Sequence, residues 1–438
     1  MKEIFKNKEL RTKILIIFLL MVFVRIGSII PIPGVNTEYM KAIMSNSGLG
    51  FLNMITGNSL SQMSLFALSI SPYITASIII QLLTVVFPSL EELQKDGKTG
   101  RDKIERITII TGIVLALLQS LFMTIGFGQK GLLDPYTWWM VLIMTTVWTG
   151  GAALLMFIGN RITKIELGNG TSYILICNIL STFPNDILTI KYGIIDDREL
   201  KYKIINCLLV GIVLLAVIIA CVILSTAVRK IPMTFSGKMV GKNVEQDLPI
   251  QLNTCGVMPI IFSSSLMSLP ILLSAFLKNV TWLSEVAKYL NQNYWFNKSD
   301  IKYTLGVLVY IVLTYCFTYF YLNINFNVIE IAKNLKQQGA MIPGVRPGKA
   351  TQDYLEKIST KIAMLGTTYM LLIILISNAI CNLNGLGILS IGGTSILICV
   401  SVVIESSKIL KTAIQSAKSR SYYTNKKGAA FKLFGVAR

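Results

Sequence analysis

The chain has 438 residues, of which 53% are hydrophobic and 14% are charged, and its mean hydropathy is +0.63. These values lie far outside the range of soluble domains and indicate a polytopic membrane protein. The chain carries 41 Lys and Arg, 22 Asp and Glu, and no histidine. Nucleophile activation by histidine, imidazole metal sites and histidine proton relays are therefore excluded.

The chain begins with charged residues, and a long apolar segment follows them. The charged residues 1–13 lead directly into an apolar run without a small-residue cleavage site, so we expect a retained span and not a signal peptide. A hydrocarbon core of ~30 Å needs about 20 apolar residues per helix. The segments that meet this length are 14–33, 66–87, 104–126, 138–159, 171–190, 204–228, 250–277, 303–324, 361–382 and 388–411. The sequence therefore predicts an all-α fold with ten transmembrane helices.

Residues 48–65, between the first two spans, do not fit either a span or a free loop. They are interrupted by Gly48, Gly50, Gly57 and Asn58, yet they remain largely apolar. Irregular backbone at membrane depth is tolerated only inside protein or beside a water-filled cavity. We therefore predict a re-entrant plug helix here, and a helix lying flat on the outer surface is the alternative.

An internal repeat links the second and seventh spans. Residues 257–264 (VMPIIFSS) repeat the pattern of residues 70–77 (ISPYITAS), including the proline. The two spans differ in number by five, so the two copies cross the membrane in opposite directions. This arrangement predicts two inverted five-helix halves, namely residues 1–190 and 204–438, joined by an external hinge loop at 191–203.

The distribution of basic residues gives the orientation. With a cytoplasmic N-terminus, 30 Lys and Arg fall on the inside and 10 on the outside, and Arg25 lies within the first span. This bias predicts cytoplasmic termini, cytoplasmic loops at 229–249 and 325–361, and a cytoplasmic tail at 412–438. For Arg25 we expect a structural role, by snorkelling or by pairing within the bundle.

The sequence offers no catalytic chemistry. All seven cysteines stand alone in apolar stretches, and there is neither a complete phosphate-binding loop nor a GxSxG motif. We predict no catalytic residue, no metal and no cofactor, and we do not expect an enzyme. The alternative function is a secondary transporter with inverted repeats, but Asp186 and Glu405 lie near span ends and not at mid-membrane, where coupling groups usually lie.

Several long motifs, in order along the chain, resemble the SecY family of protein-conducting channels. They are RIGSIIPIPG at 25–34, SLFALSISPYITASIIIQLL at 64–83, DGKTGRDKIERIT at 96–108, LGNGTSYILICNIL at 167–180, RKIP at 229–232, IQLNTCGVMPIIFSSSL at 250–266, EIAKNLKQQGAMIPGVRPGKAT at 330–351 and GGTSILI at 392–398. The resemblance implies the central pore of the Sec translocon in the bacterial plasma membrane. Such a channel passes unfolded secretory proteins and releases membrane proteins sideways into the lipid bilayer. The implied partners are the small subunits SecE and SecG, the SecA ATPase, the ribosome, signal sequences and nascent chains.

The resemblance also assigns residues to the pore and to its lateral gate. A pore ring of branched aliphatic side chains, which would dewet and block ions, falls on Ile70, Ile74, Leu175, Ile179, Ile261 and Ile398. A polar cluster at the lateral gate falls on Thr75, Gln119 and Asn253, where hydrogen bonds would hold the gate shut. Asn58 and Ser69 depart from the family pattern, which often has glycine at both positions.

The cytoplasmic loops carry the implied docking surface. Pro343-Gly344 and Pro347-Gly348 flank Arg346 and predict a stiff turn that presents its guanidinium outward. The resemblance implies that both loops dock SecA or the ribosome, and basic residues suit RNA phosphates as well as acidic protein surfaces. The predicted docking residues are Arg346, Lys349, Arg229, Lys230 and Lys238.

Overall fold

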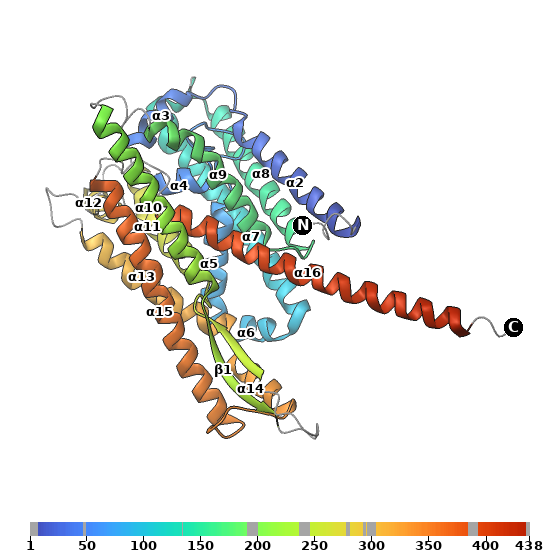
Figure 1. The fold of residues 1–438 in the computed structure, drawn as a ribbon. Coiled ribbons are helices and arrows are strands. Elements are labelled where there is room, and N and C mark those ends of the chain that lie inside the picture. Colours follow the sequence, from blue (N-terminus) through green and yellow to red (C-terminus); the bar gives the residue numbers. More distant parts are fainter. Residues whose placement is uncertain are drawn as a thin grey trace.

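Ten long helices form the core of the computed structural model, which describes residues 8–46, 50–133, 135–190, 200–235, 246–276, 281–291, 295, 304–383 and 393–434 (Figure 1). Each long helix corresponds to one predicted span. They are α2 (Lys8–Ile29), α5 (Ser71–Val86), α7 (Gly97–Phe127), α8 (Trp138–Thr163), α9 (Gly170–Ile190), α10 (Leu200–Thr226), α11 (Met258–Phe276), α13 (Thr304–Asn325), α15 (Lys349–Leu383) and α16 (Gly393–Phe434). The prediction of ten membrane helices is thus confirmed.

Two of these helices begin later than the sequence predicts. The second span was expected from residue 66 and the seventh from residue 250, but α5 begins at Ser71 and α11 at Met258. In each helix a proline, Pro72 or Pro259, is the second residue. Proline fits the first turn of a helix, where its missing N–H would have no partner. These prolines therefore start the helices and do not loosen their interiors.

The plug segment lies inside the protein. After α3 (Thr37–Asn46), the short helix α4 (Gly50–Ile55) is followed by turns up to residue 70. Met54, Ile55, Leu60 and Met63 are all buried, and the indole of Trp148 on α8 donates a hydrogen bond to the Ser64 carbonyl at 3.2 Å. This burial favours the re-entrant plug over a helix lying flat on the surface. Residues 48 and 49 lie outside the described residues.

The two loops predicted to be cytoplasmic contain a small sheet that the sequence did not predict. Strands β1 (Val228–Phe235), β2 (Gln246–Gln251) and β3 (Ala340–Met341) pair antiparallel in the order β2-β1-β3. Because β3 belongs to the other loop, the sheet joins the two loops. Two alternating residues of β1 face a buried cluster. In it, Ile231 and Met233 pack with Leu355 and with α14 (Val328–Gln337).

The shorter elements connect the long helices. Helix α6 (Pro88–Lys95) turns away from α5 by 107° at Phe87, where Pro88 prevents the helix from continuing. A π-turn, η1 (Gly128–Leu132), ends α7, and α12 (Thr281–Leu290) follows α11. The last helix, α16, runs away from the bundle toward the C-terminus (Figure 1). In the predicted external hinge loop, residues 191–199 lie outside the described part, and α10 takes up the rest.

Candidate functional site: the apolar centre, plug and lateral seam

The structure brings the six predicted pore-ring residues into one buried apolar cluster. Ile74 lies in the first turn of α5 and Ile70 directly precedes that helix, while the others come from α9, α11 and α16. Their side chains are between 0 and 6% exposed, and they are Ile70, Ile74, Leu175, Ile179, Ile261 and Ile398. Branched aliphatic side chains offer water no hydrogen bonds, so a narrow neck lined by them would dewet.

The plug helix α4 lies against this cluster. It packs on α9 and α11, and its residues Met54 and Ile55 belong to the same buried cluster. The start of α16 also reaches the plug, where the Ser395 hydroxyl contacts the Met54 sulfur. The plug therefore touches three of the four helices that supply the predicted ring.

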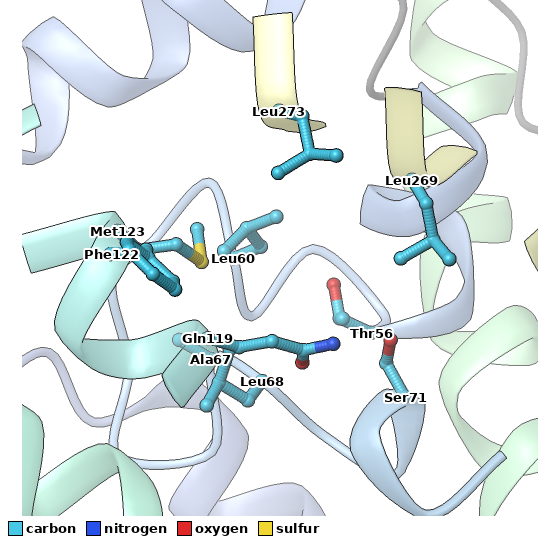
Figure 2. Close-up of a pocket in the computed structure, with 10 residues that line it drawn as sticks. All are labelled: Thr56, Leu60, Ala67, Leu68, Ser71, Gln119, Phe122, Met123, Leu269 and Leu273. Carbon is cyan, nitrogen blue, oxygen red and sulfur yellow. The ribbon is translucent and has the colours of Figure 1, made fainter. Parts of the chain in front are cut away.

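A pocket of about 160 Å³ lies between the plug, α7 and α11 (Figure 2). Its walls are mostly apolar, with Leu60 from the plug, Phe122 and Met123 from α7, and Leu269 and Leu273 from α11. The side chain of Gln119 extends across the pocket toward Thr56 and Ser71 (Figure 2). The seam between α7 and α11 thus has an apolar interior with a few polar groups at one end.

The three predicted lateral-gate residues do not form a hydrogen-bonded cluster. The Thr75 hydroxyl donates to the Ser71 carbonyl of its own helix at 3.2 Å, while Asn253 lies in the turn before α11. Within the described residues, no hydrogen bond joins Thr75, Gln119 and Asn253. Of the three, only Gln119 lines the pocket.

Both departures from the family pattern occupy backbone positions that favour glycine. Asn58 has φ 65° and Ser69 has φ 49°, in the left-handed region that most side chains avoid. Asn58 is held by Asn53, whose Nδ2 donates to the Asn58 Oδ1 at 2.9 Å. Asparagine tolerates this conformation better than serine does, so Ser69 is the more strained of the two.

Four of the predicted docking residues lie on the unit formed by the two loops that the sheet joins. Arg346 and Lys349 are exposed, and the hydroxyl of Thr351 donates to the Arg346 carbonyl at 2.9 Å, which fixes the turn. Arg229 and Lys230 are exposed on β1. The Lys230 Nζ lies 3.9 Å from the Asp247 Oδ2 on the neighbouring strand β2. Lys238 lies outside the described residues.

Two polar residues hold the plug: sequence reasoning missed Asn178, whereas a structural role was expected for Arg25. Asn178 on α9 donates to the Ile55 carbonyl at 2.9 Å, and Arg25 on α2 donates to the Gly57 carbonyl at 3.2 Å. A polar side chain in an apolar span is the signal that could have identified Asn178. In the described part of the chain, no group of three or more Cys, Asp or Glu residues is placed to hold a metal ion.

A bundle of ten helices around a buried plug, with an apolar centre and an apolar pocket at the seam between α7 and α11, defines a membrane protein of the channel or transporter class. The chain belongs to the SecY family, whose family model matches residues 64–407. It is 34% identical over 422 residues to the protein translocase subunit SecY of Halalkalibacterium halodurans, covering 94% of this chain and 96% of that protein. The SecY subunit of Bacillus subtilis is 35% identical over 428 residues, covering 95% and 97%.

Solved structures show the same fold. One, described as a protein-conducting channel, matches 90% of both chains with a TM-score of 0.63 and 19% identity. Sec61 in the canine ribosome-channel complex from the endoplasmic reticulum matches 90% of both chains with a TM-score of 0.59 and 18% identity.

Proposed function

We propose that this chain is the central, pore-forming subunit of a Sec translocon in the bacterial plasma membrane. It passes unfolded secretory proteins across the membrane and releases membrane proteins sideways into the lipid bilayer. The proposal is supported by its SecY relatives, which are named protein translocase subunits. The observation that carries it is the burial of six branched aliphatic residues from four helices in one cluster against the plug.

The apolar ring provides the seal. Four helices contribute its members, so the ring can widen by helix movement; they are Ile70, Ile74, Leu175, Ile179, Ile261 and Ile398. Aliphatic side chains make no sequence-specific contacts, and they can deform around an extended polypeptide of any sequence. A ring of this chemistry thus blocks ions at rest and accepts unrelated substrates when open.

The lateral exit lies where α5 and α7 meet α11. Gln119 in the pocket, with Thr75 and Asn253 on the flanking elements, marks this seam. Because no hydrogen bond between these three closes the seam in the described residues, closure depends mainly on apolar packing. An apolar signal helix can replace such packing with contacts of its own at small net cost.

The two cytoplasmic loops form the docking face for the driving partner. Arg346 and Lys349 at the turn, Arg229 and Lys230 on the hairpin, and Lys238 in the same loop supply positive charge suited to RNA phosphates and to acidic protein surfaces. The solved ribosome-channel complex with Sec61 supports a ribosomal partner. SecA with ATP is the second driving partner, and SecE and SecG are the small membrane subunits. Because SecA and the ribosome act from the cytoplasm, the docking loops lie on that side of the membrane, and both termini lie there with them.

Export by reconstituted vesicles tests the proposal. The chain, co-expressed with its own SecE and SecG, is placed in proteoliposomes with SecA, ATP and a preprotein. We expect the preprotein to become protected from protease in an ATP-dependent manner. A saturable uptake of a small solute driven by an ion gradient, without preprotein protection, would instead support the secondary transporter.

A further inference from the structure

We propose that Asn178 is a positioning residue that couples the plug to the start of the gate helix α5 through a single side-chain amide. The inference rests on the proposed channel function. Asn178 lies on α9, next to Ile179 of the predicted ring, and is 1% exposed. Its Nδ2 donates both to the Ile55 carbonyl and to the Ser69 hydroxyl, each at 2.9 Å.

The first of these bonds holds the plug. Ile55 is the last residue of α4, and a helix leaves its final carbonyls without partners inside the helix. Asn178 satisfies one of them from α9, while Arg25 on α2 donates to the carbonyl of Gly57. The end of the plug helix is thus held between two spans, an arrangement that we call the plug clasp (Arg25, Asn178, and the carbonyls of Ile55 and Gly57).

The fit around the clasp is tight. Gly57 has φ +66°, and a Cβ added there would lie 2.9 Å from the Asn178 Cα and 3.0 Å from the Arg25 Nη1. Only glycine gives the backbone both this conformation and this approach. A larger residue at position 57 would therefore push the end of the plug away from Asn178 and Arg25.

The second bond holds the entrance to α5. Ser69 is 2% exposed and has φ 49°, a conformation that costs a serine free energy. It directly precedes Ile70 of the predicted ring, and α5 begins at Ser71. The bond from Asn178 opposes the relaxation of this backbone, so losing it would free the segment that leads into α5.

One amide therefore connects the two parts that must move when the channel opens. If the plug leaves, Asn178 loses the Ile55 carbonyl; if α5 swings, it loses the Ser69 hydroxyl. Within the described residues the Asn178 Oδ1 is buried without a hydrogen-bond partner, and this unsatisfied group reduces the net stabilisation from the two bonds. A clasp of this kind is strong enough to bias the resting state and weak enough to be displaced by a substrate.

The test measures resting anion leak and hydrogen–deuterium exchange on proteoliposomes of the whole complex. For Asn178→Ala we expect roughly tenfold more resting leak and faster amide exchange in residues 53–61, because the substitution removes two buried neutral hydrogen bonds. Ser69→Ala should give a smaller increase, and the double variant should leak no more than Asn178→Ala, because both changes remove the same bond. Should Asn178→Ala fail to accumulate, Ser69→Ala alone decides: normal leak and normal exchange would overturn the proposal.

Thr182→Ala is the matched control. Thr182 is equally buried one turn further along α9, but its hydroxyl donates to the Ile179 carbonyl of its own helix at 2.8 Å. We expect wild-type leak and exchange from this variant. Equal leak from Thr182→Ala and Asn178→Ala would show a general loss of packing and overturn the proposal, as would additive effects in the double variant. Preprotein export by the wild-type vesicles is measured in parallel, so that failure of the channel function is distinguished from failure of the clasp.

Discussion

Ser69 and Gly256 hold the same place in two copies of one local structure. Ser69 has φ 49° and precedes Ile70, while Gly256 has φ +65° and precedes Val257. In both copies a helix then begins, with proline as its second residue. The similarity between residues 70–77 and 257–264 is therefore one of backbone conformation as well as sequence, which supports a duplicated unit.

This correspondence predicts the effect of Gly256→Ala. Nothing lies within 4 Å of a Cβ added at Gly256, so the cost is backbone strain alone, about 1 to 2 kcal/mol. We expect a lower midpoint of thermal unfolding in detergent. Gly150→Ala is the control, because Gly150 lies on α8 with equally open space and no left-handed φ. That substitution should be neutral or stabilising, and a similar loss in both variants would contradict the strain argument.

Replacing Ile398 with asparagine should open the seal. Ile398 is 1% exposed in the apolar cluster, and a polar amide there would favour water in the neck. We expect higher resting ion conductance in planar bilayers and better export of preproteins with defective signal sequences. Ile398→Val, which keeps an aliphatic side chain, should behave as the wild type. Unchanged conductance and unchanged signal stringency in Ile398→Asn would refute the ring assignment.

Reversing the charge of Arg346 should prevent SecA from driving export through the channel. Arg346 is exposed on a turn fixed by Thr351, so glutamate can replace it without disturbing a core. We expect SecA-driven export to fall by at least tenfold while the thermal unfolding midpoint is unchanged. Arg101→Glu gives the same change in net charge on an exposed residue of α7 and should export normally. Normal export by Arg346→Glu would remove this residue from the docking face.

The buried core shared by the two loops that the sheet joins should affect SecA docking indirectly. Leu355 is 0% exposed and packs with Ile231 of β1. Leu355→Ala should cost about 2 to 5 kcal/mol of local stability and weaken SecA binding, measured by surface plasmon resonance on nanodiscs. Tyr354→Ala is the control, since Tyr354 is its exposed neighbour. Faster amide exchange in β1 and β3 of Leu355→Ala alone would support the role of the joint core, and equal exchange in both variants would contradict it.

The sequence by itself determined the class of protein, the ten helices and the family. The helices follow from the lengths of the apolar runs, which are set by the membrane thickness. The family follows from motifs in a fixed order, each of which is a short stretch of sequence. The prolines at 72 and 259 were visible, but their place at helix starts was not, because the residues before each helix are uncharged and do not mark its boundary. The sheet that joins the two loops was also missed, since β3 is only two residues long and pairs with a strand far away in the sequence.

Only the tertiary structure decided how the centre is held. Asn178 lies far from Ile55 and Ser69 in the sequence, and nothing in their local patterns predicts that its amide joins them. In the described residues no hydrogen bond joins Thr75, Gln119 and Asn253, because a hydrogen bond depends on side-chain directions that residue types do not specify. Apolar burial can be predicted from composition because it is non-directional, whereas directional polar contacts require the fold.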